Sequence, residues 1–213
     1  MDSLPPDHYQ PRTESWEAVL ATLAATPAAL FELCQPLTTE RWTDFETLFG
    51  PNGACAGCWC AWFLMTNREF TEAKKEGYKQ LMRDLVEEGV EPGIIAYADG
   101  VPAGWVALAP RERYKRLATS KQLGAVDDEP VWLIPCFFIH RDYRRQGLMA
   151  KLLKAAIDYA RGKGVKTLEA FPLDVEEKIN SMSLFSGKSA VFYELGFKEV
   201  ARRDSRPIVR LKL

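Results

Sequence analysis

The fold of this chain is decided by residues 131–162, which read VWLIPCFFIHRDYRRQGLMAKLLKAAIDYARG. The first part, 131–139, is a continuous apolar run, which is typical of a strand buried on both faces. A polar loop follows over 140–147, and 148–160 then repeats apolar residues with the period of a helix. The predicted buried face of that helix consists of Met149, Leu152, Leu153, Ala156, Ile157 and Ala160. The stretch therefore predicts a buried strand, a short loop and an amphipathic helix in that order.

The loop 140–147 has the features of an anion site. The N-terminus of a helix presents backbone N–H groups without partners and the positive end of the helix dipole. Gly147 permits close approach of the backbone to a ligand, and Arg144 and Arg145 add positive charge. Such a loop suits a pyrophosphate. The alternative is an ordinary turn between strand and helix with two solvated arginines.

The segments on either side of this stretch predict an α/β protein. Helices are expected over 16–33, which Pro27 interrupts, over 39–49 and over 67–88. The segment 52–65, between the last two of these helices, is rich in Cys and Trp and has no regular period. Short strands are expected at 94–98, 103–108, 165–171, 197–203 and 207–211, a helical turn at 190–195, and a short helix or loop at 111–121.

Composition excludes several classes of protein. The chain has 213 residues with 28 Lys and Arg against 29 Asp and Glu, so it lacks the basic excess that binding nucleic acid requires. The longest apolar run is much shorter than the roughly 20 residues of a membrane-spanning helix. The N-terminus shows no secretory signal, so we expect a cytoplasmic, reducing location. The five cysteines are then not expected to form a disulfide framework.

Two motifs now stand in order along the chain. The first, Arg144-Arg145-Gln146-Gly147-Leu148-Met149, joins the central strand to the amphipathic helix, and the second runs from Phe192 to Phe197 as FYELGF. The chain resembles the GNAT family of acetyl-CoA-dependent acyltransferases. In that family the first signature is Gln/Arg-x-x-Gly-x-Gly/Ala, and the second is a helix that ends in Tyr-x-x-x-Gly-Phe.

The resemblance implies an α/β (α+β) fold. Its mixed, mostly antiparallel central sheet would splay between two parallel strands and be flanked by helices. Residues 1–36 would be an N-terminal helical extension, and 37–213 the acetyltransferase domain. A homodimer would be compatible with this arrangement.

The resemblance also implies acetyl-CoA as co-substrate, without a metal. The backbone N–H groups from Gln146 to Ala150 would hold the pyrophosphate, and the pantetheine arm would lie along Phe137–Ile139. Met149 replaces a Gly or Ala of the family but can turn onto the apolar face of the helix. Ser186 replaces a frequent Asn and can still donate a hydrogen bond. The expected cofactor-binding residues are Phe137, Phe138, Ile139, Arg144, Arg145, Gln146, Gly147, Leu148, Met149, Ala150 and Ser186.

An acceptor amine would attack the thioester directly. Tyr193 matches the general acid of the family, because an ordinary tyrosine is protonated at neutral pH and could protonate the departing thiolate. Glu169, inside an apolar strand, is the candidate base, and Asp174 is the second choice. The structural alternatives are a core aromatic at Tyr193 and a solvent-facing carboxylate at Glu169.

The segment 55–60 reads CAGCWC and leaves three alternatives open. Three thiolates could bind zinc, but a fourth ligand is not evident, and a redox pair is a further option. The segment could instead be a packed turn of the core, or Cys58, Trp59 and Trp62 could line an apolar acceptor site for the amine of a small molecule or peptide. Two other functions remain as alternatives: an acyl-CoA sensor without catalysis, and a zinc- or redox-linked interaction protein. Cys136 reads as a small core residue.

Overall fold

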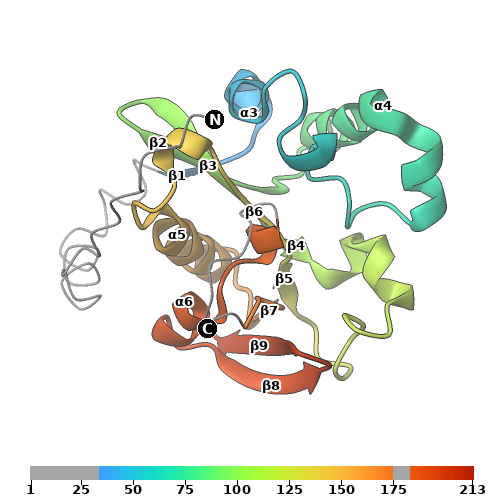
Figure 1. The fold of residues 1–213 in the computed structure, drawn as a ribbon, viewed down its shortest axis with the longest axis vertical. Coiled ribbons are helices and arrows are strands. Elements are labelled where there is room, and N and C mark those ends of the chain that lie inside the picture. The colour runs from blue at the N-terminus through green and yellow to red at the C-terminus, as the bar shows by residue number, and fades with distance from the viewer. Residues whose placement is uncertain (1–33, 175–182) are drawn as a thin grey trace, which may run out of the picture.

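The computed structural model describes residues 34–174 and 183–213, in which nine strands form two sheets (Figure 1). The order of the first sheet is β1 (Cys34–Pro36), β2 (Gly93–Ala98), β3 (Val101–Ala107) and β6 (Phe137–Ile139). The order of the second is β4 (Ala109–Pro110), β5 (Trp132–Ile134), β7 (Thr167–Ala170), β9 (Arg206–Lys212) and β8 (Lys198–Arg203). Among these strands only β5 and β7 pair in parallel; the other pairs are antiparallel.

The predicted strand 131–139 is divided between the two sheets. Its first half, β5, pairs with β7, and its second half, β6, pairs with β3. The division falls at Pro135 and Cys136, because a proline has no N–H to donate and cannot continue a ladder. The chain thus leaves β7 at this point, and the two parallel strands diverge. This confirms the expected mixed sheet that splays between two parallel strands.

Helices cover the two faces of the first sheet. The helix α5 (Leu148–Gly162) packs on β2 and β3 from one side, and α3 (Trp42–Phe49) contacts β3 from the other. Adjacent residues of β3 therefore belong to different cores: Val106 packs with the residues of α5, and Trp105 with those of α3 and α4 (Asn67–Glu87). The remaining α-helix of the described residues is α6 (Ser189–Glu194). Short 3-10 turns are η1 (Thr39–Arg41), η2 (Cys55–Gly57), η3 (Arg111–Arg113), η4 (Lys115–Thr119), η5 (Arg141–Tyr143) and η6 (Ser183–Ser186).

The predicted helices 39–49, 67–88 and 148–160 are confirmed as η1 with α3, as α4 and as α5. Thr66 and Glu69 cap α4 by bonding each other's backbone N–H, at 3.2 Å and 2.7 Å. The expected helix 16–33 lies outside the described residues, and the last three residues of the proposed extension, Cys34–Pro36, form the edge strand β1. In the described part of the chain, no helix is both long and apolar enough to cross a membrane.

Glu169 lies in a buried ion-pair network and has only 1% of its side chain exposed. Its carboxylate accepts hydrogen bonds from Arg111 and, at 2.8 Å, from Arg210. Arg210 also pairs with Asp127 at 2.7 Å. The sequence left two alternatives for this carboxylate, a solvent-facing position and an apolar environment. The structure shows neither, because the carboxylate is buried against two arginines. Both of its oxygens already bind guanidinium groups, so this geometry disfavours a role as general base.

We expect Glu169→Gln to lower the free energy of unfolding by about 3–5 kcal/mol, because it leaves two largely buried arginines without their shared counterion. Denaturant unfolding of both proteins measures the difference. Glu129→Gln is the control, since Glu129 also contacts Arg210 but is more exposed, and its loss should be much smaller. Equal losses in the two variants would contradict a structural role specific to Glu169.

Candidate functional site

The loop between β6 and α5 is held in shape by its own side chains. Nε of Arg144 donates to the carbonyl of Ile139 at 3.0 Å, and Nε2 of Gln146 donates to the carbonyl of Asp142 at 2.9 Å. Arg145 adopts a left-handed backbone (φ 62°), which a residue other than glycine rarely does. Arg144 is thus bound to the end of the strand, whereas the side chain of Arg145 is exposed.

The first turn of α5 leaves backbone donors free. Gly147 precedes the helix in a left-handed conformation (φ 76°). Within the described residues, the N–H groups of Gln146, Gly147, Leu148 and Met149 donate to no backbone carbonyl, as expected for a helix start. The N–H of Ala150, which the sequence placed among the ligand donors, instead bonds the carbonyl of Gly147 at 3.1 Å. Four such donors with a glycine among them are typical of the helix start that binds an anion.

Met149 does not obstruct the loop. Its side chain packs with the core under α5. Its Cε would lie 2.1 Å from a Cβ built on Gly187, which itself has a left-handed φ of 80°. The missing side chain of Gly187 therefore leaves room for Met149. Met149 can replace the Gly or Ala of the family because its side chain packs under α5 and not into the loop.

One edge of β6 is unpaired among the described strands. Its other edge pairs with β3, while β7 pairs with β5 and not with β6. The side chains of β6 enter the two cores: Phe137 meets Phe192 edge-on at 6.1 Å, and Phe138 lies 5.3 Å from Phe49. The free edge thus offers mainly backbone N–H and C=O groups, the requirement for binding an extended, amide-containing ligand.

Ser186 supplies a free hydroxyl near this edge. It ends η6, which contacts β6, and it is fully buried. Its Oγ has no hydrogen-bond partner among the described residues. An unsatisfied buried hydroxyl is uncommon in native proteins and costs free energy, so it suggests a partner that the free protein lacks.

Tyr193 does not reach the strand edge. Its side chain is 37% exposed, and its hydroxyl donates to Glu199 on β8 at 3.1 Å. Partial burial and Glu199 raise the pKa of this tyrosine. In FYELGF the residue four positions before Gly196 is Phe192, not Tyr193, and it is Phe192 that points at β6. The assignment of Tyr193 to the tyrosine of the family signature is therefore one position out of register.

Asp174 lies on the same outer side as Tyr193. Its carboxylate accepts from Ser189 at 2.8 Å and from Arg202 at 2.9 Å. These hydrogen bonds, led by that of Ser189, hold the pKa of Asp174 below its usual value. A carboxylate so bound is a weak proton acceptor, and neither carboxylate proposed as a base is brought to the edge of β6.

The segment before α4 places its aromatic rings in different surroundings. Trp59 is buried and stacks on Phe49 at 5.7 Å, so it belongs to the core and does not line an open site. Trp62 is 43% exposed, and the guanidinium of Arg116 lies 3.7 Å from its ring centre. Cys58 is half-buried. The structure therefore separates the three residues expected to form one acceptor wall.

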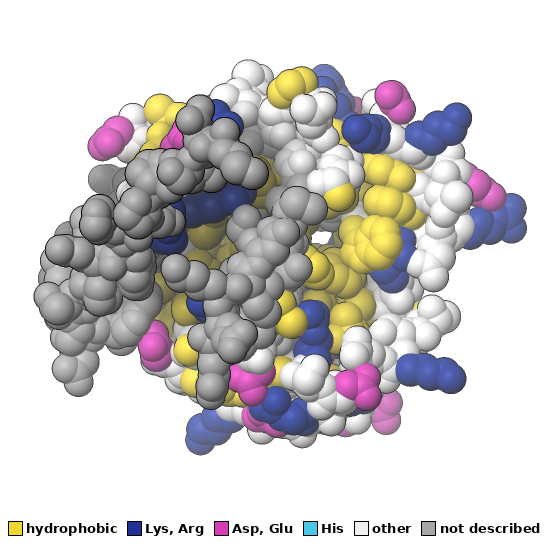
Figure 2. All heavy atoms as spheres, viewed as in Figure 1, with side chains coloured by type: hydrophobic (Ala, Val, Ile, Leu, Met, Phe, Trp, Pro, Cys, Tyr) yellow, Lys and Arg dark blue, Asp and Glu magenta, His cyan; other side chains and the backbone are white. Residues whose placement is uncertain are grey.

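A different set of rings gathers beyond the end of β7. Phe171 lies 5.5 Å from Phe63, which lies 6.2 Å from Phe185 of η6. The guanidinium of Arg206 is 5.8 Å from the ring centre of Phe171. On the face drawn in Figure 2, hydrophobic side chains surround a small hollow near the middle. The sequence did not predict this group, which includes Phe171, Phe185 and Arg206. These residues are far apart in the chain, and no local spacing indicates that the fold brings them together.

The zinc alternative for the cysteine segment finds no support among the described side chains. Within the described residues, no three Cys, His, Asp or Glu side chains lie close enough together to bind one metal ion. The side chain of Cys55 lies outside the described part of the chain.

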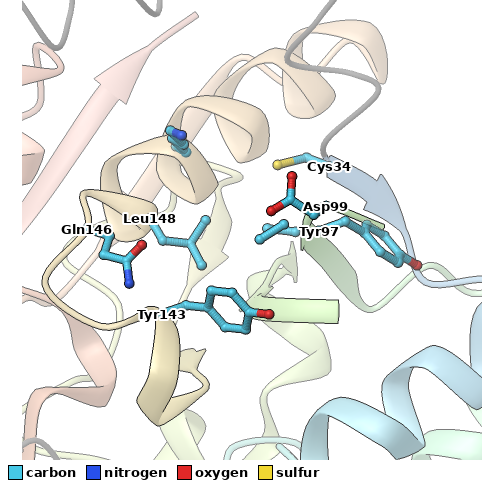
Figure 3. A pocket seen from close by; sticks show the side chains of 9 residues that line it. Cys34, Tyr97, Asp99, Tyr143, Gln146 and Leu148 are labelled. Atoms are coloured by element: carbon cyan, nitrogen blue, oxygen red, sulfur yellow. The ribbon is translucent and has the colours of Figure 1, made fainter. Parts of the chain in front are cut away.

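A pocket of about 280 Å³ lies beside the start of α5 (Figure 3). Cys34, Tyr97 and Asp99 line it from the first sheet, and Tyr143 and Gln146 from the loop. Lys151 also lines it and acts on Cys34 electrostatically, so a cation stands one turn into the helix. Positive charge therefore extends along the helix from the loop.

The chain matches the acetyltransferase (GNAT) family over residues 59–185, which is more than half its length. No curated protein sequence matches it. Among solved structures, a GNAT-family acetyltransferase from Listeria monocytogenes 4b F2365 is 11% identical, with a TM-score of 0.50 over 85% of this chain and 94% of that one. This likeness shows the fold.

Two further structures are similar at lower scores. PaiA N-acetyltransferase from Thermoplasma acidophilum, in complex with coenzyme A, is 14% identical over 84% of this chain and 98% of that one, with a TM-score of 0.47. Ribosomal-protein-alanine N-acetyltransferase from Brucella melitensis is 17% identical over 85% and 99%, with a TM-score of 0.48.

We expect Ser186→Ala to raise the free energy of unfolding of the free protein by about 1 kcal/mol, since it removes a buried hydroxyl without a partner. Ser189→Ala is the matched control: Ser189 is also buried but donates to Asp174, so its loss should destabilise by about 1 kcal/mol. Thermal unfolding in parallel measures both. Destabilisation by Ser186→Ala would mean that its hydroxyl has a partner in the free protein.

Proposed function

Since the chain belongs to the acetyltransferase (GNAT) family, we propose that it transfers an acetyl group from acetyl-CoA to the amine of a small molecule or peptide. The observation that carries this proposal is that, within residues 34–174 and 183–213, four N–H groups at the start of α5 bond no backbone carbonyl and one edge of the adjoining strand β6 pairs with no other strand. The N–H groups of α5 suit a pyrophosphate, and the edge of β6 suits an extended chain of amides.

The residues present fit acetyl-CoA. The N–H groups from Gln146 to Met149 would hold the pyrophosphate, with positive charge from Arg145 and Lys151. The pantetheine arm would extend along Phe137–Ile139, and Ser186 would give its hydroxyl to an amide of the arm. This contact would satisfy a hydroxyl that has no described partner in the free protein.

The acceptor would bind beside the half-buried Phe185 and Arg206, which adjoin the buried rings of Phe63 and Phe171 beyond the end of β7. These rings favour an amine that carries an apolar group. Arg206 beside Phe171 forms no ion pair with a described carboxylate, and burial lowers the pKa of its guanidinium. A cation at this wall disfavours polycationic acceptors.

We expect Gly147→Asp to weaken acetyl-CoA binding by about 100-fold or more, because it puts a negative charge where the pyrophosphate would lie. Calorimetric titration measures this, and the release of CoA thiol with a library of amines tests the transfer. Gly164→Asp is the control: Gly164 follows the other end of α5 with φ 75°, and a Cβ at either glycine meets no atom within 4 Å. The cofactor site would be refuted if both variants bound acetyl-CoA as the unaltered protein does.

We expect Tyr193→Phe to change kcat by less than about twofold, because the hydroxyl faces Glu199 and not the edge of β6, whereas losing a general acid typically lowers rates about 10²–10⁴-fold. Steady-state release of CoA thiol with a saturating acceptor is the measurement. A drop in kcat of the larger size would return Tyr193 to the role of acid.

A further inference from the structure

The hairpin of β8 and β9 carries four arginines, and one of them has no partner among the described residues. Arg202 binds two carboxylates, Arg203 donates to two backbone carbonyls, and Arg210 binds three carboxylates. The guanidinium of Arg206 makes no hydrogen bond or ion pair with any residue of 34–174 or 183–213. Within these residues, Arg206 is therefore the arginine of the hairpin whose fork of N–H donors is available to a ligand.

Arg206 carries its charge in surroundings that shield it in part from water and offer no described counterion. The side chain is half-buried, and its guanidinium lies 5.8 Å from the ring centre of Phe171, which is 1% exposed. Burial lowers the pKa of the guanidinium, and no described carboxylate opposes that effect. An arginine remains protonated at neutral pH in spite of such a shift. A partly buried charge without a counterion is unfavourable, and an anionic ligand would relieve this.

The register of the strands places Arg206 at the reacting end of the cofactor site. The last pair between the parallel strands β5 and β7 is Ile134 with Ala170, so Phe171 stands level with Pro135, where the central strand divides. The pyrophosphate of acetyl-CoA would lie at the other end of β6, at the start of α5, so the thioester would reach this point of division. Arg206 beside Phe171 would therefore meet the acceptor and not the phosphates of the cofactor.

We propose that Arg206 binds the carboxylate of the acceptor, and that the acceptor is a free amino acid with an apolar side chain. This inference rests on the proposed function and narrows it from amines in general to amines that carry a carboxylate. A guanidinium fork matches a carboxylate through two parallel hydrogen bonds. The apolar side chain would lie beside Phe185 and the rings that adjoin it.

A free amino acid fits this arrangement better than a peptide does. Its amine and its carboxylate are a few bonds apart, which suits a site where the thioester and the guanidinium flank one phenyl ring. In a peptide, the carboxyl group next to the amino-terminal amine is part of an amide and offers Arg206 no charge. In the transfer, the amine nitrogen bonds the acetyl carbon, the bond from that carbon to the CoA sulfur breaks, and one proton of the amine passes to that sulfur.

The test compares acceptors that differ only in the carboxylate. The standard amino acids are screened for the release of CoA thiol from acetyl-CoA, and the best of them is compared with its carboxamide. In the unaltered protein, we expect kcat/KM to be about 100-fold or more higher for the amino acid, because the carboxamide leaves the guanidinium without an anion.

Arg206→Gln should lower kcat/KM for the amino acid about 100-fold or more, mainly through KM, and should change the value for the carboxamide less than about twofold. Arg206→Lys keeps the charge without the fork and should recover part of the loss. Arg202→Gln is the matched control, because it removes the same charge from the same hairpin, whereas Arg202 binds Glu199 and Asp174 on the outer side. It should leave kcat/KM for both acceptors unchanged.

Each other outcome overturns the carboxylate site. Equal kcat/KM for the amino acid and its carboxamide in the unaltered protein would do so without any variant. An equal fall for both acceptors in Arg206→Gln would assign Arg206 to the thioester or to the stability of the fold. Transfer to peptides or other amines, while no free amino acid reacts, would refute the site and leave the proposed function intact. Failure to bind acetyl-CoA in the titration would overturn the proposed function and this inference together.

Discussion

The division of one strand between two sheets is the constraint on which the site depends. Pro135 cannot donate to a ladder, so the chain pairs with β7 before it and with β3 after it. Since β6 joins only β3 among the described strands, its second edge is open. The second half of the strand, β6, also leads directly into the loop before α5. The division at Pro135 therefore places the open strand edge next to the N–H groups at the start of the helix.

The strand, loop and helix of 131–162 could be predicted from the sequence because their signals are local. A continuous apolar run, a glycine before a helix and a helical apolar period each need only neighbouring residues. The mixed sheet was expected only from the resemblance to the family that the two motifs carry. The division of the strand at Pro135 emerged only in the structure, although Pro135 is the one residue of the run that cannot donate to a ladder.

The chemistry of the site was less predictable because it depends on register and on distant partners. One step along a helix turns a side chain by about 100°, so a shift of one residue exchanges Phe192 for Tyr193 at the strand edge. Glu169 meets Arg111 and Arg210, which lie 58 and 41 positions away, and no local pattern announces such pairs.

Several groups around the free edge of β6 lack hydrogen-bond partners among the described residues. The hydroxyl of Ser186 lacks a partner, and the N–H groups at the start of α5 have no carbonyls. Elsewhere, buried charges such as Glu169 are fully paired. Polar groups that lack partners beside one strand edge preorganise that edge for binding, because a ligand that supplies the missing partners gains free energy without rearranging the chain.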